Sequence, residues 1–254
     1  MNYYIITGAS KGLGFELSKL LFNKENKVFL LSRKTNENLM TIAKKADCQA
    51  VYKEINLDSL FAIEDTMKEI FEEIDLSSAS RIALVNNAGG VDPIKPMDKV
   101  EDHEIVQNIN LNLTAPLILT SSFLRRTKEF SGDKRIITIS SGAGKRPIEG
   151  WGSYCVAKCG VDMMTKVVAL EAGQNGVKCI SFGPGIMDTG MQATIRSSNE
   201  EDFKDVEKFK GFKSDGKLLA ASLVAEKVHY LLYTEDDFEH GGLVNVSDYI
   251  KSED

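Results

Sequence analysis

The chain has 254 residues, of which 43% are hydrophobic, and a formal net charge of -6 at pH 7. This length and composition predict one α/β domain over residues 1–254 with a substantial core. The modest charge, without a basic stripe, argues against nucleic-acid binding. The sequence has no apolar run long enough to cross a membrane and no basic leader or signal-peptide core at its start. We therefore expect a cytoplasmic protein with no membrane association.

The chain contains four scattered cysteines, Cys48, Cys155, Cys159 and Cys179, a pattern typical of reduced thiols. Cys155 and Cys159 share a helix face and resemble half of a metal site. None of the three histidines stands at ligand spacing, so we predict no metal centre and assign the pair to helix packing.

Short runs rich in Val, Ile and Leu alternate with longer amphipathic segments along the chain. Strands are predicted at Tyr3–Thr7, Lys27–Ser32, Gln49–Ile55, Arg81–Asn86, Arg135–Ser140, Val177–Phe182 and Leu243–Val246. Helices are predicted near Gly12–Asn23, Asn36–Ala46, Ser59–Ile74, Asp98–Glu129, Trp151–Ala172 and Ala220–Tyr233. Apolar strands separated by helices indicate a doubly wound (Rossmann) sheet of about seven mostly parallel strands, with helices on both faces.

A glycine-rich segment, Thr7 to Gly14, joins the first strand to the first helix. Glycines at this position let the backbone approach a pyrophosphate, which the helix N-terminus stabilises. A phosphate-binding loop of the Walker type is excluded because no Gly-Lys-Ser/Thr follows the glycines. A turn without a ligand is the alternative, but the place in the first βα unit favours a dinucleotide. The candidate binding residues are Gly8, Ser10, Lys11, Gly12, Leu13 and Gly14.

The second strand is followed by Arg33, where a dehydrogenase that prefers NAD usually has an acidic residue. Arg33 and Lys11 together suit a ribose 2′-phosphate, which favours NADP(H) as the cofactor. The alternative is that both are solvated surface charges.

Later strand ends add further candidates. Asn86-Asn87-Ala88-Gly89 follows the fourth strand and lies beside the expected dinucleotide crevice, unless it is only a turn. The segment Gly183 to Thr189 follows the sixth strand, and its backbone would reach the far end of the cofactor.

Tyr154 and Lys158 lie one helical turn apart on the same face of the helix predicted at Trp151–Ala172. An ammonium beside a phenol lowers its pKa and makes it a usable proton donor. The alternative is a pair of exposed polar side chains on an ordinary helix.

Two further positions carry chemical information. Pro116 cannot donate to the carbonyl of Asn112, so it predicts a kink and a free carbonyl that water could bind, unless a helix simply begins or ends there. Ser141 follows the fifth strand without a GxSxG elbow or a partner histidine. It is better interpreted as a donor to a carbonyl oxygen than as a hydrolase nucleophile.

From Tyr3 to about Val246 the chain resembles the short-chain dehydrogenase/reductase family. TGASKGLG is similar to the family's TGxxxGxG turn, NNAG matches its tetrapeptide, and four residues fall where its catalytic tetrad falls: Asn112, Ser141, Tyr154 and Lys158. The resemblance implies that Tyr154 donates the proton, that Lys158 lowers its pKa and binds the nicotinamide ribose, and that Ser141 polarises the carbonyl. It also implies that Asn112 holds a relay water. Further cofactor contacts are expected at Asn56, Leu57, Asn87, Ala88, Gly89, Gly185, Met187 and Thr189.

The segments around Trp151 and after Pro184 resemble the sepiapterin reductase and bacterial benzil reductase branch, which reduces vicinal dicarbonyl compounds with NADPH. Asn56 replaces the family's adenine-contacting aspartate, and Asn245 replaces the carboxylate that anchors a pterin in animal sepiapterin reductases. The second change favours hydrophobic diketones over sepiapterin. An insertion at about residues 190–216 corresponds to the substrate loop, with a small helix expected at Asn199–Phe209.

The resulting expectation is an NADPH-dependent reductase of a small-molecule carbonyl substrate, assembled as a homodimer or homotetramer. The alternative is a cofactor-binding sensor or scaffold that keeps the fold without turnover, because fold alone does not fix function.

Overall fold

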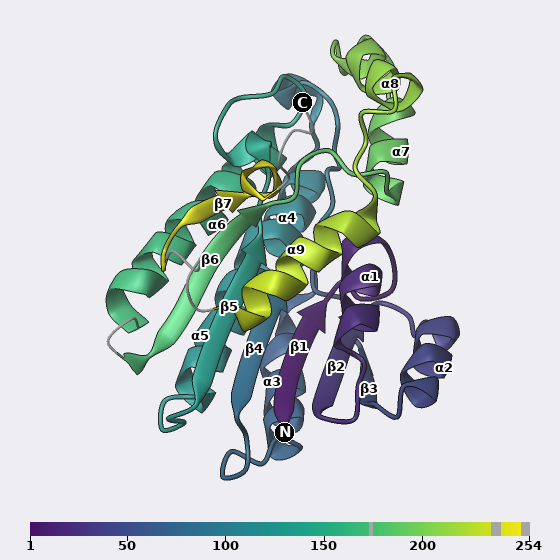
Figure 1. Ribbon diagram of the computed structural model, residues 1–254. Coiled ribbons are helices and arrows are strands. Elements are labelled where there is room, and N and C mark those ends of the chain that lie inside the picture. The colour runs from purple at the N-terminus through teal and green to yellow at the C-terminus, as the bar shows by residue number, and fades with distance from the viewer. Residues whose placement is uncertain (173–174, 235–239, 250–254) are drawn as a thin grey trace.

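The computed structural model describes residues 1–172, 175–234 and 240–249. Seven strands form one parallel sheet in the order β3-β2-β1-β4-β5-β6-β7 (Figure 1). The strands are β1 (Asn2–Thr7), β2 (Asn26–Ser32), β3 (Gln49–Glu54), β4 (Arg81–Asn86), β5 (Asp133–Ile139), β6 (Val177–Gly183) and β7 (Leu243–Asn245). The predicted doubly wound sheet is confirmed.

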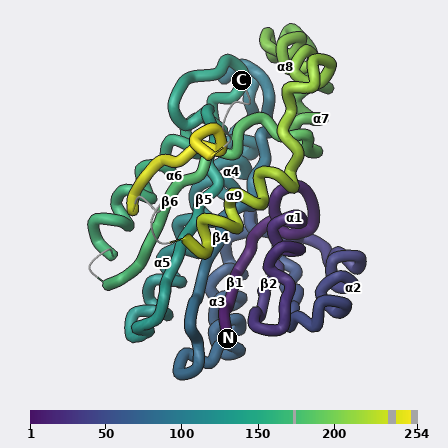
Figure 2. Tube along the Cα trace, viewed as in Figure 1, coloured from purple at the N-terminus to yellow at the C-terminus, as the bar shows by residue number. Residues whose placement is uncertain are grey.

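Helices cover both faces of the sheet (Figure 2). One face carries α1 (Gly12–Leu21), α2 (Glu37–Lys45) and α9 (Ala221–Tyr233), and the other carries α3 (Ile63–Glu72), α5 (Ala115–Arg126) and α6 (Gly152–Ala172). Side chains alternate between the two cores: Tyr4 and Ile6 of β1 pack on the α1 and α9 side, whereas Tyr3 and Ile5 pack on the α3 and α5 side. This two-sided burial explains the continuous apolar strands.

The central strand β1 pairs with β2 on one side and with β4 on the other. The chain thus leaves the middle of the sheet in opposite directions, and the carboxyl ends of β1 and β4 form the switch point where doubly wound folds bind ligands. Thr7 and Asn86 end these two strands. Two further helices, α7 (Gly190–Arg196) and α8 (Val206–Ser214), stand beyond this edge of the sheet (Figure 1).

The helix predicted at Asp98–Glu129 is interrupted. The helix α4 (Asp102–Ile109) is followed by a π-helical turn at Asn110–Thr114 and then by α5. Within the turn, the Ala115 N–H donates to the carbonyl of Asn110, five residues back. Because Pro116 has no N–H, the regular pattern cannot continue through this stretch, and one π turn absorbs the irregularity.

The small helix expected at Asn199–Phe209 was placed wrongly. The structure has α8 at Val206–Ser214 instead. The side-chain oxygen of Asn199 accepts from the Asp202 N–H at 2.8 Å, which forms a local turn in place of helix.

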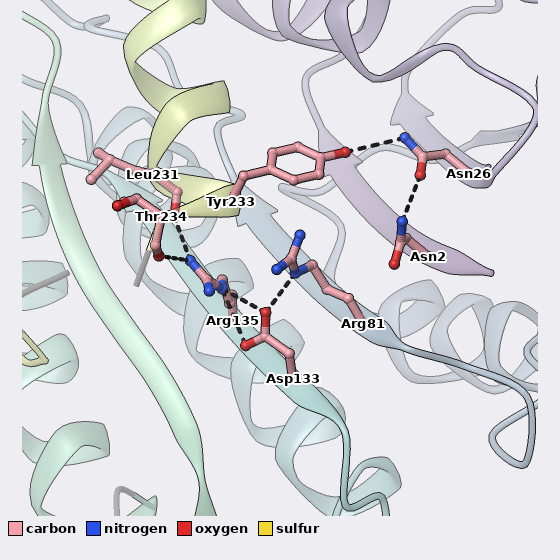
Figure 3. A network of polar contacts seen from close by, with 8 residues as sticks. All are labelled: Asn2, Asn26, Arg81, Asp133, Arg135, Leu231, Tyr233 and Thr234. Atoms are coloured by element: carbon pink, nitrogen blue, oxygen red, sulfur yellow. Dashed lines mark hydrogen bonds and ion pairs between the residues drawn. The ribbon is translucent and has the colours of Figure 1, made fainter. Parts of the chain in front are cut away.

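A buried polar network lies on the α9 side, toward the amino end of β5 (Figure 3). Arg135 shares its face of β5 with Ile137 and Ile139 and is fully buried. Its guanidinium donates to Asp133 and to the backbone carbonyls of Leu231 and Thr234. Because the last carbonyls of a helix lack partners within the helix, this arrangement satisfies the end of α9 and joins it to the sheet.

Candidate active site

The glycine turn after β1 requires its glycines. Gly8 and Gly12 have φ of 67° and 57°, in the left-handed region. A Cβ on Gly14 would lie 2.4 Å from the carbonyl oxygen of Gly8, so no larger residue fits there. The turn leads directly into the first turn of α1, which leaves backbone donors at a helix N-terminus for an anion.

The segment after β4 braces this turn. The side-chain amide of Asn87 donates to the carbonyls of Thr7 at 2.8 Å and Gly8 at 3.3 Å. In return, the Thr7 hydroxyl oxygen accepts from the backbone N–H groups of Asn87 and Ala88, both at 2.9 Å. Asn87 was predicted as a cofactor contact, and its described bonds lock the glycine turn. Thr7 begins the motif TGASKGLG but was not among the predicted site residues, because its hydrogen bonds to the segment after β4 depend on the pairing of β1 with β4.

Lys11 and Arg33 are both exposed. Within the described ranges neither has an ion pair or a side-chain hydrogen bond, so both are available to an anionic ligand. Asn36, which sequence reasoning also missed, donates to the carbonyl of Ser10 at 2.8 Å and caps α2 through the Leu39 N–H. The start of α2 is thereby fixed to the glycine turn.

The remaining predicted cofactor residues border the same edge of the sheet. After β3, Asn56 is exposed and Leu57 is buried. After β6, Met187 pairs with Leu219, and Thr189 precedes α7. A Cβ on Gly12 would lie 3.5 Å from Cγ2 of Thr189, so the loop after β6 reaches the glycine turn. Gly185 has φ of 70°, which explains a glycine at that bend.

Tyr154 and Lys158 lie in the first turns of α6 and are each 5% exposed. The Lys158 Nζ is 5.6 Å from the centre of the Tyr154 ring and donates to the carbonyl of Ile139 at 2.9 Å. Ser141 follows β5, and its hydroxyl oxygen accepts from the Ala143 N–H at 3.2 Å. The sequence-predicted phenol, ammonium and hydroxyl therefore converge at the carboxyl end of β5.

The pKa of Tyr154 differs from the expectation. Burial raises the pKa of Tyr154 to about 12, while a hydrogen bond with Ser141 acts in the opposite direction. Burial also lowers the pKa of Lys158 to about 8, against the field of Asp162. Because Lys158 loses its charge before Tyr154 titrates, the expected lowering of the phenol pKa by the ammonium is absent and burial dominates.

Asn112 lies in the π-helical turn and is buried. Its side-chain oxygen accepts from the Gly90 N–H at 3.2 Å, and its amide donates to the carbonyls of Gly90 at 2.9 Å and Asn108 at 3.0 Å. A Cβ on Gly89 would lie 2.9 Å from Asn112 Oδ1 and 3.6 Å from Lys158 Nζ. Asn112 Oδ1 and Lys158 Nζ therefore both lie next to the side of Gly89 that a side chain would fill, so a larger residue there would disturb both groups.

An aromatic cluster surrounds Tyr154. Trp151 packs edge-on against Tyr154 with ring centres 5.7 Å apart, and it stacks on Phe203 at 5.5 Å. Phe209 of α8 packs on both Trp151 and Phe203. The Tyr154 hydroxyl meets the sulfur of Met191, in α7, at 4.0 Å. The insertion thus packs on Trp151 through Phe203 and Phe209 and reaches the phenol through Met191.

Neither a metal-ion site nor a membrane-spanning helix is found among the described residues. Within residues 1–172, 175–234 and 240–249, no group of three His, Cys, Asp or Glu side chains could hold a metal ion. The same residues contain no helix both long and apolar enough to span a bilayer. Cys155 and Cys159 are free thiols, one partly buried and one exposed.

Residues 2–200 match the family model described as short chain dehydrogenase. The chain is 41% identical over 250 residues to a benzil reductase ((S)-benzoin forming) of Bacillus cereus, covering 98% of this chain and 100% of that protein. It is 31% identical over 257 residues to the sepiapterin reductase of Mus musculus, covering 96% of each chain. A short chain dehydrogenase/reductase structure from Saccharomyces cerevisiae superposes with a TM-score of 0.84 at 23% identity, covering 96% of each chain.

The doubly wound sheet, with Tyr154 and Lys158 at its carboxyl edge, is the arrangement found in oxidoreductases with a dinucleotide-binding fold. Because the family model spans most of the sequence, the chain belongs to the short-chain dehydrogenase family.

Proposed function

We propose that this protein is an NADPH-dependent carbonyl reductase whose substrate is an apolar vicinal dicarbonyl compound such as benzil. The observation that carries the proposal is the convergence of Tyr154, Lys158 and Ser141 beside the glycine turn, within an aromatic cluster. The high identity to a benzil reductase of Bacillus cereus supports the same choice.

The chain's own residues fit a dinucleotide cofactor. The glycine turn leads into α1, whose N-terminal backbone N–H groups would bind a phosphate, and Lys11 and Arg33, exposed and without a side-chain partner in the described ranges, would hold a 2′-phosphate. When bound, the reduced nicotinamide supplies the hydride. Residues at the end of β4 and in the loop after β6 would border the cofactor: Asn87, Ala88, Gly89, Gly185, Met187 and Thr189.

The catalytic residues have separate roles. Tyr154 protonates the substrate oxygen as the carbonyl carbon is reduced, so that a ketone becomes an alcohol. A pKa of about 12 keeps the phenol protonated at neutral pH but makes it a weak acid, so the hydrogen bond with Ser141, which lowers this pKa, favours the proton transfer. Ser141 donates to the same oxygen, and Lys158 holds the nicotinamide ribose. Because the Asn112 side chain already bonds Gly90 and Asn108, its backbone carbonyl would hold the water that returns a proton to Tyr154.

The substrate class follows from the lining of the site. Trp151, Phe203 and Phe209 are buried and pack on one another, so they form an apolar wall behind Tyr154 that suits an apolar substrate better than a polar one. The amide of Asn245 accepts from Lys145 at 3.2 Å, and as an uncharged group it is a weaker anchor for a pterin than a carboxylate. Both features favour a diketone over sepiapterin.

The test is cofactor oxidation with a panel of carbonyl compounds. Purified protein is mixed with NADPH or NADH and with benzil, sepiapterin or a simple monoketone, and absorbance is followed at saturating cofactor. We expect rapid NADPH oxidation with benzil, slower oxidation with the others and little with NADH. A strong preference for sepiapterin would overturn the diketone assignment, and tight NADPH binding without turnover of any compound would favour the sensor alternative.

A further inference from the structure

A buried carboxylate lies behind the catalytic residues and has no place in the mechanism above. Asp162 is on α6, one turn beyond Lys158, and is 6% exposed. Its Oδ1 accepts a hydrogen bond from the hydroxyl of Ser181 on β6. A buried carboxylate with one neutral partner is costly unless a positive charge lies nearby.

The same carboxylate supports the turn that carries Ser141. A Cβ on Gly144 would lie 2.9 Å from Asp162 Oδ2 and 2.8 Å from the carbonyl oxygen of Lys158. The turn Gly142–Gly144 therefore packs directly on α6 between these two atoms. Ser140, Ser141, Asp162 and Ser181 line one small space between β5, β6 and α6.

The charged and titratable groups around Lys158 come from few elements. On α6 they are Tyr154 and Asp162. Lys145 follows the turn Gly142–Gly144 and borders the small space, but it is exposed and donates to Asn245. The groups from β6 and the π-helical turn, Ser181 and Asn112, are neutral. Asp162 is thus the negative charge that opposes the burial of Lys158.

We propose that Asp162 is a positioning residue of the active site: its contacts with Ser181 and Gly144 hold α6 against the Ser141 turn, and its carboxylate, one helical turn beyond Lys158, favours the ammonium form of that side chain. The proposal rests on the proposed function only where it concerns turnover. The charge of Lys158 can be measured in the protein without any substrate.

The experiment is an NMR titration of the Lys158 side chain in protein labelled with 15N-lysine, with its signal assigned by its loss in Lys158→Met. Asp162→Asn keeps the shape and removes the charge, so we expect the titration midpoint to fall from about 8 by about one pH unit. Asp162→Glu should restore most of the shift. In turnover assays of Asp162→Asn, the alkaline limb of the kcat/KM profile should move to lower pH.

Ser181→Ala is the matched control, because it removes the hydrogen bond and leaves the carboxylate. We expect lower thermal stability and an unchanged Lys158 midpoint. An Asp162→Asn midpoint equal to that of the wild type would overturn the proposal, as would an equal shift in Ser181→Ala. A wild-type protein that reduces no carbonyl would refute the proposed function, yet the NMR shift would still decide the role of Asp162.

Discussion

At the scale of single residues, burial sets the protonation states of the catalytic pair in opposite directions. Desolvation disfavours whichever form is charged, so it raises the pKa of Tyr154 and lowers that of Lys158. The phenol therefore holds its proton at neutral pH, whereas Lys158 loses its proton closer to neutral pH than an exposed lysine does. A protonated phenol beside an ammonium suits reduction, in which the protein gives a proton to the product.

Cofactor preference tests the assignment of Arg33. Hydrogen bonds to charged groups contribute about 1.5–3 kcal/mol, so Arg33→Asp should lower the preference for NADPH over NADH at least about tenfold. The ratio of kcat/KM values for the two cofactors measures it. Lys34→Asp makes the same charge change one residue later and should leave the ratio nearly unchanged. An unchanged ratio in Arg33→Asp would mean that Arg33 is only a solvated surface charge.

Residue spacing predicted which side chains converge, but not their environments. The one-turn separation of Tyr154 and Lys158 and the strand-end place of Ser141 follow from local periodicity. The burial of Lys158 and the pairing of Asp162 with Ser181 depend on contacts between α6 and β6, which no local pattern encodes. Asp162 did carry a weak signal, because it follows Lys158 by one helical turn.

At the scale of elements, the strands were predicted best because each is a buried apolar run bounded by polar residues. Pro116 correctly marked an irregular helix, since a missing N–H must disturb the local hydrogen bonding. Its form, a π-helical turn that bonds Asn112 to Gly90, depends on tertiary contacts. The position of α8 was predicted wrongly because the side-chain oxygen of Asn199 accepts from the backbone N–H of Asp202 and so competes with helical hydrogen bonds there.

The end of α9 supplies a stability prediction. Arg135→Ala removes a buried guanidinium that bonds Asp133 and the carbonyls of Leu231 and Thr234 (Figure 3). We expect the free energy of unfolding to fall by about 3–5 kcal/mol in urea titrations. The partly exposed side chain of Arg81 also pairs with Asp133, and Arg81→Ala should lower the free energy of unfolding by less than Arg135→Ala does. Equal losses in the two variants would contradict the special role of the helix end.

At the scale of the whole molecule, α6 presents an apolar stripe to solvent. Its residues are Val156, Met163, Val167 and Leu170, and Leu170 is 82% exposed. Exposed apolar side chains aligned along one helix are typical of a protein contact, and a second copy of the chain is the partner that the family resemblance implies. We propose a homodimer or homotetramer built on this stripe.

The assembly can be measured by light scattering coupled to gel filtration. The wild type should have a mass of at least twice 28.0 kDa. Two charges placed on the stripe, Met163→Glu with Leu170→Glu, should give a monomer, because an apolar interface cannot bury them unpaired. Phe61→Glu, at a side chain 95% exposed outside the stripe, is the control and should leave the mass unchanged. A monomeric wild type would contradict the proposal.

The central claim is that Tyr154 gives the proton in a carbonyl reduction. Its most direct test is the rate of NADPH oxidation by Tyr154→Phe with benzil, measured beside NADPH binding by fluorescence. Phenylalanine keeps the ring contacts with Trp151 and removes only the hydroxyl. We expect kcat to fall at least about a hundredfold while NADPH affinity stays near that of the wild type. Turnover retained at the wild-type rate would contradict the account.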